Sequence, residues 1–401
     1  FFYIYLLIDS INGILLRNFS DLPISLSQIF KLMLFCSMII LIIFKTRFKW
    51  HNFFIILFFT IYLVFIFSKN IEQGVSIVKF LIIPLTYMIF ALYKINNNEI
   101  KKIIYLNFTW IAINIVLGIA GLGYPQYNAG QIGTRGFFYA GNDLSTVFII
   151  MSFFILYITR TKYSKYYYIM LCIFLIFLAV NLATKVAIFG IFILISSFLL
   201  DKFNNKHLSK KNLHKVVCVF LGLFVLTLFL LALTSLEGLI ERTKYALVKH
   251  DNLISTLLSA RDIKLRKAFT YFFNNFSINW LLFGSSSKIV TEMDFFDVFL
   301  NYGVFGLVGL LFVCGYGFHK QYIRLKKQRD YYIRKLLFFN CLIVVIAFLS
   351  GHILFSATVN AFISIINVYV EKSLKRQTIK RIFLISNMYP SEKYPFCGTF
   401  V

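Results

Sequence analysis

Three acidic residues, Glu292, Asp294 and Asp297, lie within six positions of a chain that has 16 acids in 401 residues. On a helix Asp294 and Asp297 share a face, where one carboxylate could accept a proton while the other orients it. The neighbouring rings of Phe295 and Phe296 would desolvate a carboxylate. The dipole of a helix N-terminus also favours acids, so the cluster has a structural explanation too. The three acids are candidates for a general base.

Arg135 lies in the segment GTRGFFYAGND, whose glycines leave the backbone free to approach a ligand closely. Its planar guanidinium matches phosphate oxygens, and each charge-assisted hydrogen bond contributes about 1.5 to 3 kcal/mol. Lys185, in NLATK, is a second cation beside an apolar run. Both have a plain alternative, because loop arginines are commonly solvated and lysines at span ends can extend to the interface.

Residues 254–276 predict an amphipathic helix along the membrane surface, because apolar residues recur at helical spacing. Arg261 falls on this apolar stripe, between Leu258 and Leu265, where an ordinary solvated cation is not expected. Arg266 is predicted on the other face, four residues after Asp262, where an ion pair within the helix would explain it.

Asp9 and Asn12 stand within or at the end of the first apolar run, in LLIDSINGILL. An acid inside a membrane is costly and is usually paired or functional. Lys31 and Lys79, also within apolar segments, are candidate partners, and a structural ion pair is the slightly favoured explanation.

The composition predicts a polytopic membrane protein, with 59% apolar residues, 14% charged residues and a mean hydropathy of +0.79. A water-soluble fold could not cover so much apolar surface. The net charge of +25 would suggest nucleic acid for a soluble protein. Membrane proteins instead gather Lys and Arg in cytoplasmic loops, so no nucleic-acid partner is inferred.

Apolar runs long enough to cross about 30 Å of hydrocarbon recur along the chain, and we expect an all-α fold with about twelve transmembrane helices. They are predicted near residues 1–16, 28–44, 52–67, 75–93, 103–121, 143–159, 166–182, 186–200, 216–236, 294–318, 335–351 and 355–370. Basic clusters alternate with connections poor in cations, which places both termini in the cytoplasm. The long, partly helical segment 237–293 then lies outside and is the place where we expect the site.

The order of several segments resembles the O-antigen polymerase and ligase superfamily, and within it the Wzy-type polysaccharide polymerases, over about residues 1–370. The segments are DSINGILL, TRGFFYAGND, NLATKVAIFGIFIL, LSARD, NWLLFGSSS and EMDFFDVFLNYGVFG. Each is degenerate alone, and the specific feature is their order, with a long polar segment before a late span.

The resemblance implies an inverting glycosyltransferase of the GT-C kind that needs no metal or cofactor. It would act at the outer face of a bacterial plasma membrane on undecaprenyl-diphosphate-linked oligosaccharides, and a chain-length regulator is a further partner that such enzymes can have. By position, Arg135, Lys185, Arg261 and Arg266 would bind the diphosphate of the donor. The two histidines of the outer segments lack further ligands at metal-binding spacing, so the residues themselves indicate no metal site.

The resemblance leaves more than one function open. Ligases of the superfamily commonly carry a histidine in the segment that matches EMDFFD, and its absence from this chain favours a polymerase of capsule, O-antigen or exopolysaccharide over a ligase. A flippase for lipid-linked oligosaccharides would carry its cations within the spans, whereas these mostly flank them.

The last residues, KRIFLISNMYPSEKYPFCGTFV, resemble the start of a family 4 glycosyltransferase of the GT-B kind. Residues 382–385 predict a buried strand, and a loop follows it. We therefore expect residues 371–401 to be a cytoplasmic tail that either continues into a fused transferase or marks the junction of two neighbouring genes.

Overall fold

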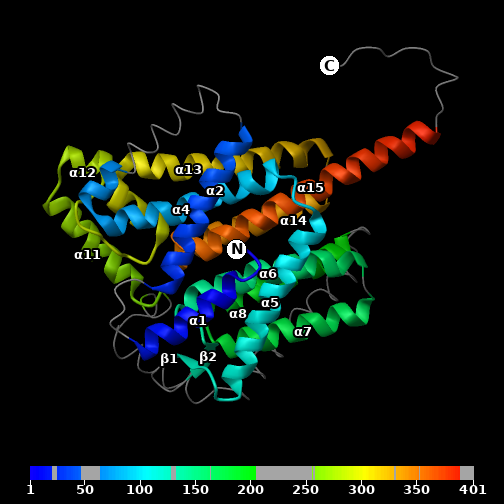
Figure 1. Ribbon diagram of the computed structural model, residues 1–401, viewed down its shortest axis with the longest axis horizontal. Helices are drawn as coiled ribbons and strands as arrows, with labels where there is room; N and C mark the ends of the chain where they lie inside the picture. The colour runs from blue at the N-terminus through cyan, green and yellow to red at the C-terminus, as the bar shows by residue number, and fades with distance from the viewer. Residues whose placement is uncertain are drawn as a thin grey trace, which may run out of the picture.

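The computed structural model describes residues 1–19, 25–46, 64–127, 132–162, 164–204, 255, 258–328, 331–351 and 353–388, and it is a bundle of helices with one hairpin (Figure 1). The helices are α1 Tyr5–Asn18, α2 Leu26–Thr46, α4 Ile71–Leu92, α5 Asn97–Ile119, α6 Gly141–Lys162, α7 Lys165–Leu182, α8 Lys185–Asn204, α11 Arg261–Asn274, α12 Ile278–Phe283, α13 Asp294–Gln328, α14 Tyr331–Ser350 and α15 Ala357–Met388. The strands are β1 Tyr124–Tyr127 and β2 Ile132–Gly136.

Within the described residues, six helices are long and apolar enough to cross a membrane, namely α2, α4, α5, α6, α13 and α14. The shorter apolar helices α7 and α8 are separated as the NLATK segment predicts, because Ala183 adopts a left-handed conformation (φ 52°) that ends α7. A polytopic membrane fold is thus confirmed. The expected spans at 52–67 and 216–236 lie largely or wholly outside the described residues, so the number twelve stays a prediction.

Helix α15 is the central helix of the bundle, and it packs against α4, α5, α6 and α14. Its first half is buried on every side, with Val359, Phe362 and Ile366 fully inaccessible. This buried half also carries polar residues, among them Thr358, Asn360 and Ser364, which are themselves buried. Polar side chains at the start of α15 therefore face neighbouring helices and are placed to hold buried groups.

The expected strand at residues 382–385 is wrong, because α15 runs without a break to Met388 (Figure 1). A helix satisfies its backbone hydrogen bonds within one segment, whereas a single strand has no partner here. The predicted boundary at residue 370 also falls inside this helix. Residues 389–401 lie outside the described part of the chain.

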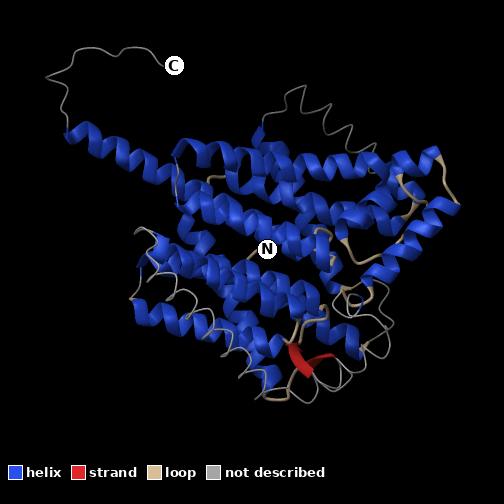
Figure 2. Ribbon diagram, turned by 180° about the vertical axis from the view of Figure 1, so that it is seen from behind, coloured by secondary structure: helices blue, strands red, loops and turns tan. Residues whose placement is uncertain are grey.

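The segment between α5 and α6, expected as a loop, contains the antiparallel hairpin of β1 and β2 (Figure 2). The hairpin packs against α5 and α7. It is anchored by Asn114 of α5, whose Oδ1 accepts a hydrogen bond from the backbone N–H of Phe137 at 3.2 Å. This anchor fixes the residues that connect β2 to α6.

The polar segment before α13 is partly helical, as expected, and folds back on the bundle through α11 and α12 (Figure 1). Gly303 interrupts α13 with a non-helical conformation (φ 66°), and a Cβ atom there would lie 2.4 Å from the Leu282 carbonyl. Gly284, at the end of α12, meets the backbone of Asn301 in the same way. The two glycines let α12 lie directly against the kink of α13.

Candidate functional site

A charged cluster joins Arg261 and Lys264 of α11 to Glu292, which lies two residues before the start of α13. The Arg261 Nε atom lies 3.5 Å from the Glu292 Oε2 atom, and the Lys264 ammonium contacts the Glu292 Oε1 atom. The side chains of Arg261 and Glu292 are 14% and 28% exposed. Arg261 is thus mostly buried next to an acid. The helix expected over residues 254–276 begins only at Arg261, because Ser259 and Ala260 are left-handed, so Leu258 does not share a helical stripe with Arg261.

The backbone around this cluster is strained. Five non-glycine residues in the described ranges have positive φ angles, and four of them lie beside candidate site residues. These four are Ala183, Ser259, Ala260 and Glu292, with φ angles of 52°, 55°, 63° and 62°. Such conformations cost roughly 1 to 3 kcal/mol each and gather at functional sites. Their concentration here supports a functional use of this end of the bundle.

Asp294 and Asp297 sit in the first turn of α13, but they hold different partners. The Asp294 Oδ2 atom accepts hydrogen bonds from the backbone N–H groups of Ile353 and Leu354, each at 2.8 Å. The Asp297 Oδ1 atom accepts from the Thr291 N–H at 2.6 Å and from its hydroxyl at 2.8 Å. Both aspartates are buried, whereas Glu292 is partly exposed. Glu292 is therefore the most accessible of the three predicted bases.

Lys185 approaches the same cluster from another part of the chain. It is the first residue of α8, and its Nζ atom lies 3.3 Å from the Ser259 Oγ atom, two residues before Arg261. The left-handed turn at Ala183 reverses the chain between α7 and α8 and so presents Lys185 at this end. Two of the predicted cations, far apart in sequence, are thus brought to one place.

Arg135 lies on β2, which packs against the same turn. A Cβ atom on Gly133 would lie 2.4 Å from the Cβ atom of Ala183, so only glycine allows this approach. The Arg135 Nη1 atom donates to the Tyr139 carbonyl at 2.7 Å, and the Arg135 side chain is half-buried. Arg135 therefore lies on a strand that packs against the α7–α8 turn, two residues after the glycine that contacts Ala183.

Arg266, the fourth predicted cation, is exposed on α11. In the described part of the chain, no ion pair joins it to Asp262, whose Oδ2 atom instead accepts a hydrogen bond from Ser255 at 2.5 Å. The proposed intrahelical pair is therefore not formed, because Asp262 is drawn to the segment before α11. The place of Arg266 on the other face agrees with the sequence pattern.

Asp9 forms the ion pair that the sequence favours. Its Oδ1 atom lies 2.9 Å from the Lys31 Nζ atom and accepts a hydrogen bond from Ser27 at 2.5 Å. The Asn12 Oδ1 atom accepts from the Ser27 N–H at 3.0 Å. Of the two candidate lysines, Lys31 is the direct partner, because α1 and α2 pack side by side.

A cavity of about 120 Å³, which we name the polar pocket, lies beside this ion pair. Its polar lining comprises Asp9, Asn12, Ser27, Lys31, Asp143 and Thr358. Sequence reasoning missed Asp143 and Thr358, which α6 and α15 contribute. The available signal for Asp143 was an acid in GTRGFFYAGND at the start of a long apolar run.

The connection between α14 and α15 links the charged cluster to the polar pocket. Next to this connection, the Leu349 carbonyl accepts a hydrogen bond from Arg261 at 3.0 Å, and Ile353 and Leu354 bind Asp294. Further along, the Ser356 hydroxyl donates to Asp143 and the Thr358 hydroxyl to Asp9, each at 2.7 Å. The short stretch from the end of α14 to the start of α15 thus binds side chains from four other helices.

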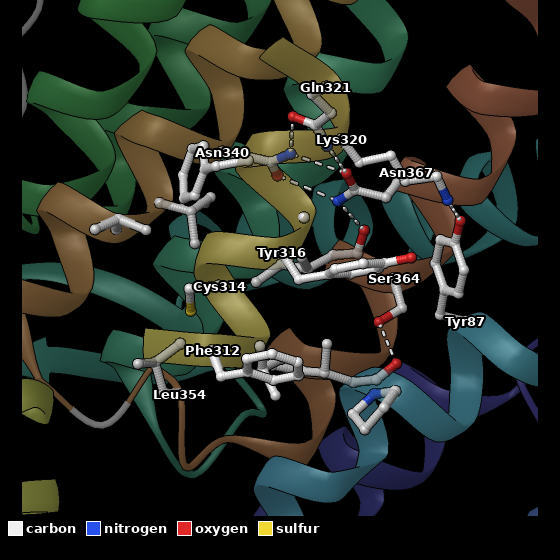
Figure 3. Close-up of a pocket in the computed structure, with 18 of the residues that line it drawn as sticks. Tyr87, Phe312, Cys314, Tyr316, Lys320, Gln321, Asn340, Leu354, Ser364 and Asn367 are labelled. Carbon is white, nitrogen blue, oxygen red and sulfur yellow. Dashed lines mark hydrogen bonds between the residues drawn. The ribbon is translucent and has the colours of Figure 1, made fainter. Parts of the chain in front are cut away.

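An apolar cavity of about 340 Å³ lies among α4, α13, α14 and α15 (Figure 3). Leu354, which binds Asp294 through its N–H, lines one part of it together with Phe312 and Cys314. At the other end Gln321, Asn340 and Asn367 hydrogen-bond to one another, and Lys320 donates to the Tyr87 hydroxyl at 3.0 Å. The cavity is mostly apolar with a polar end, a lining that suits an amphiphile.

The site presents fixed cations and one accessible carboxylate, which suits the binding of an anionic group and a proton transfer. Among the residues that the structure describes, no three or more His, Cys, Asp or Glu side chains are grouped to hold a metal ion. The two histidines of the outer segments, at positions 250 and 352, lie outside the described ranges.

Comparison with known proteins identifies the family. The model for O-antigen ligase-like membrane proteins matches residues 1–253, which include Asp9, Arg135 and Lys185. Searches of curated proteins and of solved structures gave no match. The match covers more than half of the 401 residues and agrees with the bundle of apolar helices. The chain belongs to the family of O-antigen ligase-like membrane proteins, which have a role in glycan processing.

Proposed function

We propose that this protein is a polysaccharide polymerase that joins undecaprenyl-diphosphate-linked oligosaccharide repeat units at the outer face of a bacterial plasma membrane. The observation that carries the proposal is the gathering of Arg261, Lys185 and Glu292 at one end of the bundle, with Arg135 on a strand that packs against the α7–α8 turn. Family membership supports a lipid-linked glycan as substrate.

In the proposed reaction a hydroxyl at the non-reducing end of one lipid-linked unit attacks the anomeric carbon of the sugar on another. The new C–O bond forms as the bond from that carbon to the diphosphate oxygen breaks, and undecaprenyl diphosphate leaves with the bonding electrons. Arg135, Lys185 and Arg261 stabilise the negative charge that develops on the leaving group. Fixed cations can do this without a metal ion, in keeping with an inverting, metal-independent transferase.

Glu292 is the proposed base that takes the hydroxyl proton, because it is partly exposed while Asp294 and Asp297 are buried. Donor binding would compete for Arg261, which now neutralises Glu292. The Glu292 carboxylate, which also contacts Lys264, would then accept a proton as the acceptor arrives. Asp294 and Asp297 would hold α13 and the α14–α15 connection in place beside it.

The apolar cavity beside Leu354 is proposed to take part of the prenyl tail of a lipid-linked unit. It starts at the residue whose N–H binds Asp294, so a tail there would continue away from the charged cluster into the bundle. Arg266 is exposed, and its part in diphosphate binding stays a prediction of the family resemblance.

The test is to delete the gene in its host and restore it with Arg135→Ala, Lys185→Ala or Arg261→Ala. Each variant should reach the membrane but leave single repeat units on lipid, measured by gel and mass spectrometry of the surface glycan. Lys267→Ala is the matched control, since it removes an exposed cation from the same helix as Arg261. Normal polymer from the Arg135 and Arg261 variants would contradict the diphosphate assignment.

A ligase is the second candidate, because the matching family is described by that activity. It differs in the acceptor, so the deletion strain separates the two. A ligase mutant would accumulate complete polymer on the lipid, whereas a polymerase mutant would accumulate single units. Lipid-linked units trapped on the cytoplasmic side would instead indicate a flippase.

A further inference from the structure

The polar pocket holds more charge than a structural ion pair requires. Asp9 and Lys31 already neutralise each other, yet Asp143 also lines the cavity and Lys79 lies within electrostatic range of Lys31 and Asp143. Ionisable groups inside an apolar bundle are costly and are retained where they serve a function. Replacing buried ion pairs with apolar residues is often neutral or stabilising, so the stability of the fold does not by itself explain why four ionisable residues lie here.

The lining of the pocket fits a sugar ring. The carboxylates of Asp9 and Asp143 can accept hydrogen bonds from hydroxyl groups, and the Lys31 ammonium can donate them. Phe138 and Tyr139 add aromatic surface beside these polar groups. A few convergent polar groups against aromatic walls are the usual features of a small-molecule site.

The lining of the pocket carries two carboxylates, Asp9 and Asp143, and one ammonium group, Lys31. A carboxylate on the ligand would therefore meet an excess of negative charge in a buried site, which disfavours it. The pocket therefore suits a neutral sugar, recognised through its hydroxyl groups, rather than an acidic one.

The pocket is joined to the proposed diphosphate site by one residue. Tyr139 lines the pocket, the residue is 56% exposed, and its carbonyl accepts the hydrogen bond from Arg135 at 2.7 Å. A diphosphate on Arg135 would therefore place the sugar bonded to it next to the mouth of the pocket. The α14–α15 connection, through Ser356 and Thr358, ties the same pocket to the cluster of Arg261 and Glu292.

We propose that the polar pocket binds the neutral sugar directly attached to the diphosphate of the donor lipid. This inference rests on the proposed function, since it names the part of the donor that this pocket recognises. Asp9 and Asp143 select the hydroxyl groups of that sugar, and Tyr139 packs against its ring. The pocket thereby holds the anomeric carbon between the cationic side chains that bind the diphosphate and the attacking hydroxyl.

The experiment compares two ligands on the purified full chain in nanodiscs. They are undecaprenyl diphosphate, which has no sugar, and the lipid-linked repeat unit isolated from the deletion strain, and native mass spectrometry gives their relative affinities. The unaltered chain should prefer the sugar-bearing lipid by about tenfold or more, because buried polar groups strongly reject a ligand that lacks their partners. Asp143→Asn and Tyr139→Ala should each lose most of this preference while binding undecaprenyl diphosphate as before.

Tyr139 is an exposed residue, so removal of its side chain tests the pocket even if the Asp143 variant fails to fold. Retained preference in both variants, or in Tyr139→Ala where Asp143→Asn does not fold, would overturn the sugar pocket. Arg261→Ala separates this result from a failure of the proposed function, because it should weaken both ligands alike. If Arg261→Ala changes neither affinity, the diphosphate site is wrong, whatever the pocket variants show.

Discussion

At the scale of single residues, the structure assigns different environments to three acids that the sequence could only group. Asp294 binds two backbone N–H groups, Asp297 binds Thr291, and Glu292 faces Arg261 and Lys264. The strained backbone of Glu292 is held by Gly351, where a Cβ atom would lie 2.0 Å from the Glu292 carbonyl oxygen. The left-handed conformation of Glu292 lowers the stability of the fold, and such strained residues cluster at active sites.

Glu292→Gln keeps the size of the side chain but removes its basicity, so we expect polymer formation to fall by about a hundredfold or more. The measurement is the amount and length of surface polymer in the complemented deletion strain. Glu99→Gln is the control, because Glu99 is an acid paired with Lys102 and lies outside the cluster. Normal polymer from Glu292→Gln together with loss in Asp294→Asn or Asp297→Asn would move the base to that aspartate.

At the scale of elements, the site depends on helices that begin and end at unusual backbone conformations. Helix α11 starts after two left-handed residues, Ser259 and Ala260, and this turn directs Arg261 toward Leu349 and Glu292. Helix α13 is interrupted at Gly303, which lets α12 pack against the kink. Trp280 closes this contact, with its indole N–H donating to the Leu300 carbonyl at 3.0 Å.

Gly303→Ala should lower the thermal unfolding temperature of the purified protein, measured by scanning fluorimetry. The added Cβ atom would lie 2.4 Å from the backbone of Leu282 at a φ angle of 66°, a strain of roughly 1 to 3 kcal/mol. Gly315→Ala is the matched control on the same helix, because a Cβ atom there meets nothing within 4 Å. Equal unfolding temperatures for the two variants would show that the kink is not a fixed feature.

At the scale of the whole molecule, the candidate residues gather at one end of the bundle. The segments that carry Arg135, Lys185 and Arg261 contact one another around the α7–α8 turn, and Lys320 and Glu371 lie at the polar end of the apolar cavity. The positive-inside rule predicts that the first group faces outward and the second inward. This orientation is the premise for a substrate that is already on the outer leaflet.

Labelling with a membrane-impermeant maleimide on intact cells would test the orientation. In a chain whose six native cysteines are replaced, Lys267→Cys on α11 should react in intact cells. Lys326→Cys, near the end of α13, should react only after lysis. Polymer formation by each variant is the control for folding, and the reverse labelling pattern would invert the predicted topology.

The sequence by itself determined the membrane class, most of the helices and the residue types of the candidate site. The spacing of apolar residues and the charged residues within apolar runs can both be read from a short stretch of sequence. It also indicated that Arg261 is unlike its neighbour Arg266, since one residue falls on the apolar stripe and the other does not. The break at Ala183 and an ion pair for Asp9 followed from the same local reasoning.

Only the tertiary structure decided which of these residues meet. Lys31 and not Lys79 pairs directly with Asp9, Lys185 reaches Ser259, and Asp143 joins the polar pocket through a helix distant in sequence. The strand expected at residues 382–385 became part of α15, because strand formation needs a partner that the local pattern cannot supply. Contacts between distant segments depend on how helices pack, and helical period fixes a face of each helix but not the neighbour that this face will contact.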